Sequence, residues 1–390
     1  MEGFVTAENC WPTKQQELLL RACLLSGAEC LEAWEQWRRV FEKGYVDKGS
    51  QRLLPLLYRN LQSQGIHEPL IDKFKAEYFR TWSQNQFSFR RAAPLINAFN
   101  QAGIQTMLLK GSALALLFYE DVGLRPMMDI DLLVHRNQVK PSIQLLNDLG
   151  WKSKYSSPEA LVPFEQAGEF RDAGNQNLDL HWRVLWEGRQ GLGDDQFWAE
   201  NISTEIDGIP THTLNSADQL LHVCVHGAKW NDTPSLRWVA DAMMIIRSRK
   251  LEIDWARLVR QAQQRQLTLP MRDTLSYLDN FLSASIPLEV LNNLENTPTS
   301  KLERMFYQIR LGPNDALKTV PVLWHWINSL WFDCDGHLPR RLLQFLQYLQ
   351  SLWKIKRLWH VPLYLVAKPV KRIYHALKGN LSSNWPASQY

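Results

Sequence analysis

The chain has 390 residues, of which 45% are hydrophobic and 22% charged, and it contains 17 tryptophans. This composition can bury a core and the length exceeds one small domain, so a disordered chain is excluded and two or three structural units are expected. The five cysteines are scattered without a CxxC pair, which argues against a disulfide framework or a zinc ribbon and favours the reducing cytoplasm. Because the N-terminus lacks a basic and apolar leader and no run of about 18 apolar residues occurs, we expect neither secretion nor a membrane-spanning helix.

The first hundred residues have apolar side chains at helical spacing. Helices are predicted over residues 18–41, 53–61 and about 69–102, with a break at Lys48-Gly49-Ser50. We assign residues 1–94 to an N-terminal helical region that packs as a cap on the unit that follows.

The pattern becomes that of an α/β unit near Gly103, and we place this core at residues 95–214. A short strand is predicted to end in a tight turn, Lys110-Gly111-Ser112, that leads into a helix. Further strands are predicted at 129–134, 151–155 and 177–182, with a helix at 138–149 and a hairpin at 202–213. From Ser216, which with Gln219 forms a possible capping box, the chain is helical again: we predict a helical domain at 215–300 and a basic C-terminal helical region at 301–390.

That C-terminal region has an unusual charge distribution, although the formal net charge of the whole chain is only +4. Residues 336–390 contain nine Lys or Arg and no Asp or Glu, which leaves the preceding chain acidic. Three interpretations stay open: helices packed on the acidic body, peripheral contact with an anionic membrane at its inner face, or contact with RNA.

Two aspartates, Asp129 and Asp131, are two residues apart on a predicted strand. Side chains at i and i+2 leave the same face of a strand, so both carboxylates point the same way. Two adjacent carboxylates repel and are costly to bury without a cation, and a hard divalent ion removes this conflict. An Asp-x-Asp pair by itself is also typical of a solvent-facing strand, so its surroundings must decide between the two interpretations.

Those surroundings include a possible phosphate site. A strand that ends in Gly111-Ser112 before a helix offers backbone N–H groups and a helix N-terminus to a phosphate. Gly111 permits close approach, Ser112 offers a hydroxyl, and Lys110 precedes them. Asp179 is flanked by two leucines, so its side chain projects away from the apolar face of its strand. Three carboxylates that converge from two strands suit metal-assisted phosphoryl or nucleotidyl transfer.

The sequence resembles the nucleotidyltransferase superfamily with the DNA polymerase β-like palm in three stretches: Leu109-Lys110-Gly111-Ser112, Met128-Asp129-Ile130-Asp131-Leu132-Leu133 and Leu178-Asp179-Leu180. Within that superfamily, it is similar to the bacterial family described as uncharacterised nucleotidyltransferases. The motifs of that family match three runs, namely Arg125-Pro126-Met127-Met128-Asp129-Ile130-Asp131-Leu132-Leu133-Val134, Asp179-Leu180-His181-Trp182 and His226-Gly227-Ala228-Lys229. The resemblance covers about residues 95–265.

The resemblance implies an α+β fold, with a small mixed, palm-like sheet between N-terminal and C-terminal helical segments. Asp129, Asp131 and Asp179 would ligate Mg²⁺, with Mn²⁺ as the alternative ion, and Asp179 could instead prepare the acceptor hydroxyl for attack. Gly111 and Ser112 would hold the β- and γ-phosphates of an NTP.

Further polar side chains are expected at the nucleotide site: Lys110, Arg125, His181, His226, Lys229, Arg237 and Asp241. Arg125 would neutralise the triphosphate or anchor its loop through Asp129. His181 shares the strand face of Asp179.

Two pairs of helical residues each have two interpretations. His222 and His226 are four residues apart, as two metal ligands could be, or they form a helix face that packs on the α/β unit. Arg237 and Asp241 form an intrahelical ion pair, or they line the nucleotide site with Lys229.

We therefore predict an enzyme, a Mg²⁺-dependent nucleotidyltransferase that moves a nucleotidyl group from an NTP to a hydroxyl acceptor. The acceptor could be a small molecule, a peptide or protein, or a nucleic acid. Two alternatives stay open: an NTP-dependent phosphotransferase that uses the same site, and a non-catalytic nucleotide-binding or membrane-surface regulatory protein. The presence of all three aspartates favours the enzyme.

Overall fold

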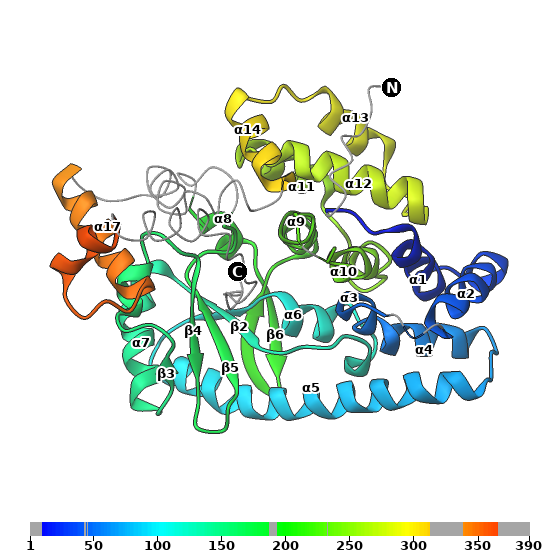
Figure 1. The fold of residues 1–390 in the computed structure, drawn as a ribbon, viewed down its shortest axis with the longest axis horizontal. Coiled ribbons are helices and arrows are strands. Elements are labelled where there is room, and N and C mark those ends of the chain that lie inside the picture. The colour runs from blue at the N-terminus through cyan, green and yellow to red at the C-terminus, as the bar shows by residue number, and fades with distance from the viewer. Residues whose placement is uncertain are drawn as a thin grey trace, which may run out of the picture.

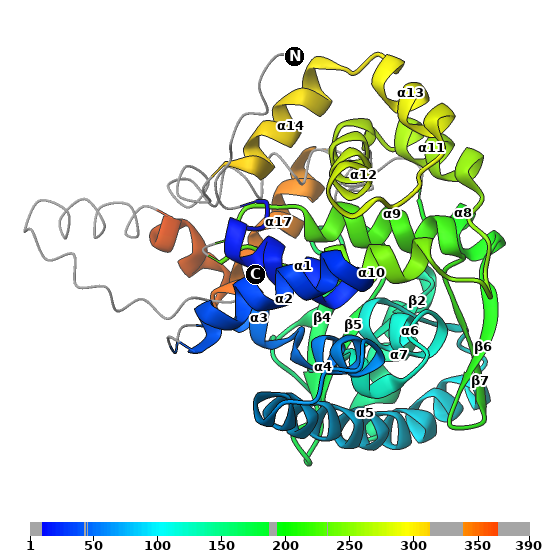
Figure 2. The same cartoon turned by 90° about the vertical axis from the view of Figure 1, so that its right-hand side faces the viewer.

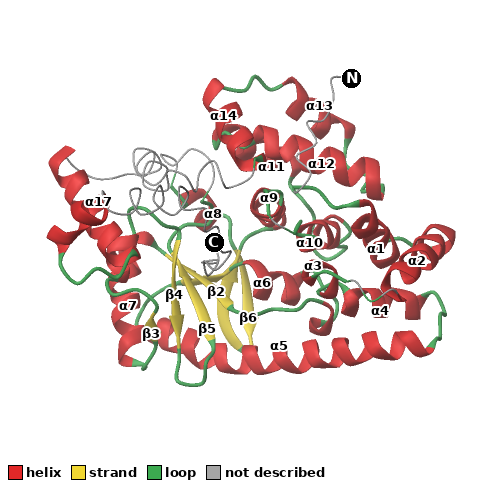
Figure 3. Cartoon of the chain, viewed as in Figure 1, coloured by secondary structure: helices red, strands yellow, loops and turns green. Residues whose placement is uncertain are grey.

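The computed structural model describes residues 10–42, 44, 46–186, 193–231, 233–312 and 338–365. One seven-stranded mixed sheet lies among helices that precede and follow it in the chain (Figures 1 and 3). The fold is therefore α+β, which confirms the fold class expected from the sequence.

The N-terminal region is helical, as the apolar spacing predicts. It comprises α1 (Lys14–Leu24), α2 (Gly27–Glu42), α3 (Lys48–Gln51), α4 (Leu54–Ser63) and α5 (Pro69–Gln101). Thr13 caps α1 in a capping box: its side chain accepts from the Gln16 N–H, and the Gln16 side chain accepts from the Thr13 N–H. These bonds satisfy N–H groups that the start of a helix leaves free. The 33-residue α5 continues through Pro94 and runs along the whole base of the molecule in Figure 1.

The sheet has the strand order β3-β4-β5-β2-β1-β7-β6. Its strands are β1 (Thr106–Leu108), β2 (Ile130–Val134), β3 (Lys152–Ser153), β4 (Ala167–Arg171), β5 (Asn177–His181), β6 (Ile202–Ile206) and β7 (Ile209–Thr213). Strand β2 pairs in parallel with β5 and antiparallel with β1, so β2 occupies the centre of the sheet. The predicted strands are present; β4 is an additional strand that sequence reasoning missed, and its alternation around Gly168 is short and weak.

The two faces of the sheet belong to different cores because side chains alternate along each strand. On β2, Ile130, Leu132 and Val134 pack with the second half of α5 and with α7 (Val139–Asp148). Leu133 faces the other way and joins the core that contains the N-terminal helices. Asp131 lies on that same second face, toward the helical half of the protein.

The chain after the sheet is helical, and Figure 2 shows these helices on the side of the sheet opposite α5. They are α9 (Ser216–Gly227), α10 (Arg237–Ile246), α11 (Trp255–Gln264), α12 (Thr268–Leu282), α13 (Leu288–Asn296) and α14 (Lys301–Leu311). The short α6 (Lys110–Leu117) and α8 (Asp195–Ala199) lie within the sheet unit, and α17 (Leu338–Leu352) follows later in the chain. The cap of α9 is Asn215, which accepts from the Asp218 N–H, so the capping box proposed for Ser216 is wrong.

The N-terminal helices share one core with α9–α13 and with one face of the sheet. Trp11, just before α1, is part of this shared core, because its ring contacts Trp238 of α10 and Tyr277 of α12 at centroid distances of 5.9 and 5.1 Å. The predicted cap therefore packs on the second helical half as well as on the sheet unit. Among the described residues, no helix is both long and apolar enough to cross a membrane.

Candidate functional site

Strands β2 and β5 bring Asp131 and Asp179 side by side. The two residues are register partners in the parallel β2–β5 pair, so their side chains leave the same face of the sheet. Asp131 is only 2% exposed and Asp179 is partly buried. Their apolar neighbours on each strand, Ile130 and Leu132 on β2 and Leu178 and Leu180 on β5, point to the opposite face and hold both strands in the core, which fixes the two carboxylates in position.

Asp129 lies one residue before β2, in the loop that enters the strand, and not inside the strand as predicted. It is partly exposed. Burial raises the pKa of its carboxyl group, and the Asp131 carboxylate raises it further. Burial likewise raises the pKa of Asp179 to about 7, again with Asp131 as the next cause. The three aspartates therefore form a cluster whose negative charge is incompletely compensated.

Lys110 and His181 are the direct partners of Asp131. The Lys110 Nζ donates to Asp131 Oδ1 over 2.7 Å, and His181 Nε2 lies 2.9 Å from the same oxygen. Burial alone would raise the pKa of Asp131, but the Lys110 ammonium and the His181 hydrogen bond outweigh it and hold this pKa well below its usual range. Burial and Lys110 lower the pKa of His181, so a neutral imidazole donates its Nε2 proton to the ionised carboxylate.

Lys110 owes its position to an unusual backbone turn between β1 and α6. Its φ of 45° lies in the left-handed region that residues other than glycine adopt only at a cost. The following Gly111 is needed for space, because a methyl group there would lie 2.7 Å from Arg125 Nη1. Ser112 is fully buried, and its hydroxyl has no hydrogen-bond partner in the described structure. The turn thus presents an unpaired hydroxyl at the first turn of α6.

Arg125 is anchored by α10. Its Nε and Nη2 donate to the two carboxylate oxygens of Asp241, each over 2.8 Å, and the Tyr119 hydroxyl donates to Asp241 Oδ1 over 2.8 Å. The loop before β2 is therefore fastened through Asp241, whereas the sequence suggested Asp129. The expected intrahelical pair of Asp241 with Arg237 does not form among the described residues, because Arg125 and Tyr119 occupy the carboxylate.

The positive charge of Arg237 lies close to the aspartates, and no carboxylate forms an ion pair with it among the described residues. Its Nη1 donates to the Pro126 carbonyl over 3.4 Å, three residues before Asp129. Burial, and then the neighbouring guanidinium groups of Arg125 and Arg52, lower the pKa of Arg237 to about 10. A buried cation among other cations favours an anionic partner.

Arg52, at the end of α3, is a residue that sequence reasoning missed. Helix α3 reaches the start of α10, because a methyl group at Gly49 would lie 3.2 Å from the Pro234 carbonyl oxygen. This contact joins segments far apart in the chain. No local motif surrounds Arg52, so no sequence signal identified it.

His222 and His226 lie on α9, with ring centroids 5.8 Å apart. Burial, and then the charges of Lys110 and His181, lower the pKa of His222 to about 3. Burial also holds the pKa of His226 well below its usual range, with Lys229 as the next cause. Both imidazoles are neutral on the helix that faces the site. Gly227 lets α9 and α10 touch, since a methyl group there would overlap the Trp238 side chain.

One group among the described residues has the spacing of a metal site. The ligand atoms of Asp131, Asp179 and His181 lie within 4.8 Å of one another. Hard ions such as Mg²⁺ prefer carboxylate oxygens and are often completed by substrate phosphates. The donor set therefore fits a divalent cation on Asp131 and Asp179, with His181 as an orienting partner of Asp131.

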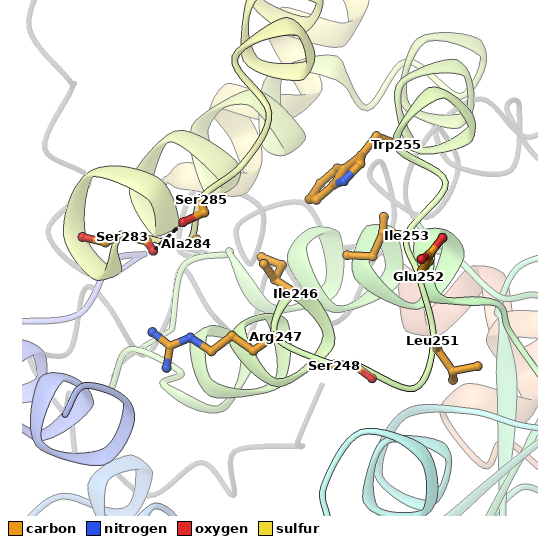
Figure 4. Close-up of a pocket in the computed structure, with 10 residues that line it drawn as sticks. All are labelled: Ile246, Arg247, Ser248, Leu251, Glu252, Ile253, Trp255, Ser283, Ala284 and Ser285. Atoms are coloured by element: carbon orange, nitrogen blue, oxygen red, sulfur yellow. Dashed lines mark hydrogen bonds between the residues drawn. The ribbon is translucent and has the colours of Figure 1, made fainter.

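A separate hollow of about 510 Å³ lies where the end of α10 and the following loop meet the end of α12 (Figure 4). Its lining includes Arg247, Glu252, Trp255 and Ser285. None of the residues that the sequence singled out lines it. The Arg247 guanidinium is used for hydrogen bonds to the Leu24 and Leu282 carbonyls, so this hollow has no charge cluster comparable to that at Asp131.

The fold and the acidic site define an α+β protein with a candidate metal centre at the middle of its sheet. The family model described as uncharacterised nucleotidyltransferase matches residues 49–283. That match spans more than half of the chain, so the protein belongs to this nucleotidyltransferase family.

Other comparisons add little to that assignment. No curated protein matches the chain. A crystal structure of an antigenic nucleotidyltransferase-like protein from Paracoccidioides brasiliensis is similar at 12% identity, over 55% of this chain and 95% of that one. Its TM-score of 0.31 is too low to support conclusions about this site.

Proposed function

We propose that the protein transfers a nucleotidyl group from an NTP to an acceptor hydroxyl, with a divalent cation, Mg²⁺ or Mn²⁺, at Asp131, Asp179 and Asp129. The observation that carries the proposal is the register pairing of Asp131 with Asp179 beside the β1–α6 turn. Membership of the nucleotidyltransferase family supports the same reaction class.

The charge balance supports a bound cation. Three carboxylates share the site with two cations, Lys110 and Arg237, because Arg125 is paired with Asp241. The pKa of Asp179 is raised to about 7 by burial and by its neighbour Asp131. When bound, a divalent ion would neutralise these carboxylates, polarise the phosphate and stabilise its developing charge. His181 fixes the orientation of Asp131 through the hydrogen bond at Nε2.

The cationic and hydroxyl groups support a triphosphate. Ser112 has an unpaired buried hydroxyl at the start of α6, and Gly111 lets the Arg125 guanidinium approach the same helix N-terminus. Lys110 supplies positive charge at Asp131, and Arg237 supplies it at Pro126, in the loop that carries Asp129. Lys229 and His226, on the α9 side, are proposed to contact the nucleotide as well.

The remaining roles follow from position. Arg125 and Asp241 hold the loop that carries Asp129, and the Nη1 of Arg125 stays beside Gly111. Asp179 is the least compensated carboxylate, so it is suited either to ligate the cation or to accept the proton of the attacking hydroxyl. The burial of Arg125, Asp131 and Asp241 strengthens the electrostatic contacts that these groups make.

The test is NTP binding with and without Mg²⁺, followed by incubation with α-labelled or γ-labelled NTP and candidate acceptors. We expect Mg²⁺-dependent binding that Asp131→Asn with Asp179→Asn weakens at least tenfold. Asp207→Asn is the matched control, because this exposed aspartate lies in the β6–β7 turn away from the site.

Transfer of the α-label supports nucleotidyl transfer, and transfer of the γ-label replaces it by phosphoryl transfer. Equal binding by the wild type and the double variant, or binding that ignores Mg²⁺, would show that the acidic cluster is not the nucleotide site. Unchanged thermal unfolding of the double variant establishes that a loss of binding is local.

A further inference from the structure

The segment 338–365 is firmly attached to the sheet unit by one face. Phe345, Tyr348 and Leu349 of α17 are buried in the core that contains the sheet. The Tyr348 hydroxyl donates to Glu165 Oε1 over 2.6 Å, and Ser351 Oγ donates to the Ser157 carbonyl over 3.1 Å. The apolar side chains hold the segment against the sheet unit, and the two hydrogen bonds fix its orientation there.

The part of this segment that follows α17 exposes large apolar side chains. Trp359 is 61% exposed, Leu363 59% and Tyr364 49%, and all three lie within six residues in the helical stretch after α17. Val361, between them, is fully buried and anchors the turn to the protein. Exposed apolar side chains gathered in this way mark an interaction surface, whereas scattered ones do not.

Basic residues border these apolar side chains. Lys354, Lys356 and Arg357 are exposed and form no salt bridge within the described chain. No acidic residue occurs from residue 336 to residue 390, and the sequence adds four more basic residues after 365. The surface therefore joins aromatic and aliphatic side chains to uncompensated positive charge.

We propose that this surface, made of Lys354, Lys356, Arg357, Trp359, Leu363 and Tyr364, docks on an anionic lipid bilayer. Trp and Tyr favour the headgroup level of a membrane, Leu enters the acyl boundary, and Lys or Arg bind anionic headgroups. Base stacking by an RNA would use only the Trp359 and Tyr364 faces, whereas a bilayer also accommodates Leu363. The attached face of α17 would hold the rest of the protein at the membrane surface.

The experiment is flotation of the full-length protein with vesicles of phosphatidylcholine alone or with about 30% phosphatidylserine. We expect flotation with the anionic vesicles and little with the neutral ones. Trp359→Ala with Leu363→Ala should abolish most of it, and each of Lys354→Gln, Lys356→Gln and Arg357→Gln should weaken it about fivefold, as expected for one basic residue at an anionic surface.

Phe79→Ala with Phe87→Ala is the matched control, because these α5 aromatics are 54% and 60% exposed and the neighbouring Arg80 and Arg91 are paired with Glu77 and Asp172. The control should float like the wild type, and equal thermal unfolding of all variants checks their fold.

Failure of the wild type to float with anionic vesicles overturns the proposal. A loss of flotation in the control equal to that in Trp359→Ala with Leu363→Ala also overturns it. A vesicle-independent change of oligomeric state in Trp359→Ala with Leu363→Ala would assign the surface to a second copy instead. Flotation does not require a nucleotide, so this outcome is independent of the proposed transferase activity.

Discussion

The guanidinium of Arg125 donates two hydrogen bonds of 2.8 Å to the carboxylate of Asp241, although the two residues are 116 positions apart in the sequence. Both side chains are nearly inaccessible, with 7% and 6% exposure. The pair joins the loop before β2 to α10, and it therefore couples the acidic site to the helical half of the protein.

Replacing Asp241 by Asn should destabilise the protein strongly. The substitution leaves a buried guanidinium without its counter-charge, which typically costs about 3–5 kcal/mol. Urea unfolding of wild type and Asp241→Asn measures the difference. As a control, Glu77→Gln removes an exposed partner of Arg80 and should change stability by less than about 1 kcal/mol. Similar losses in both variants would mean that burial does not distinguish these pairs.

Ser112→Ala should separate ligand binding from stability. The Ser112 hydroxyl is buried without a partner, so its removal should leave the ligand-free protein unchanged or slightly more stable. If this hydroxyl bonds a phosphate, nucleotide binding should weaken about tenfold, which corresponds to about 1.4 kcal/mol. Calorimetric titration and thermal unfolding measure the two effects.

The control for that experiment is Ser142→Ala on α7. Ser142 is also fully buried, but its Oγ donates to the Gln138 carbonyl over 2.7 Å. The Ser142→Ala protein should lose about 1 kcal/mol of stability and keep its nucleotide affinity. A Ser112→Ala protein with wild-type affinity would remove Ser112 from the phosphate site.

Arg237→Gln should weaken NTP binding and leave the fold intact. The guanidinium has one long hydrogen bond to Pro126, and burial among other cations lowers its pKa to about 10. Loss of a charged hydrogen bond to phosphate costs about 1.5–3 kcal/mol, or about 10- to 150-fold in affinity. Arg260→Gln, at a side chain 59% exposed on α11, is the control and should bind normally. An unaltered affinity in Arg237→Gln would assign this arginine a structural role.

Glu165 gives the protein a pH dependence that can be isolated. Burial raises its pKa from 4.5 to about 7, despite the hydrogen bond from Tyr348. The folded protein therefore holds this proton more tightly than the unfolded chain, so stability falls as pH rises from about 4.5 to about 7. The loss should be about 3–4 kcal/mol, at about 1.4 kcal/mol per pKa unit.

Glu165→Gln cannot ionise and can still accept from Tyr348. We expect it to equal the wild type near pH 4.5 and to exceed it in stability above pH 7, as measured by urea unfolding at several pH values. Glu159→Gln, an exposed neighbour in the chain, should follow the wild type throughout. Parallel profiles for wild type and Glu165→Gln would contradict the buried protonation.

Much of the fold follows from local patterns. The apolar spacing predicted α5, and strand and turn patterns predicted β2, β5 and the β6–β7 hairpin, because each pattern is a property of neighbouring residues. The weak strand β4 was missed because its sequence is short and contains a glycine. The predicted domain boundaries and the roles of the site residues stay predictions.

The sequence by itself determined that Asp131 and Asp179 leave the apolar faces of their strands and that a helix follows β1. Alternation and turn chemistry are local, so they can be read along the chain. Only the tertiary structure decided that Lys110 and His181 share Asp131, that Asp241 pairs with Arg125 and leaves Arg237 near the aspartates, and that Arg52 approaches from α3. Those partners depend on strand register and helix packing between distant segments, and the buried charges take whichever partner that packing brings within reach.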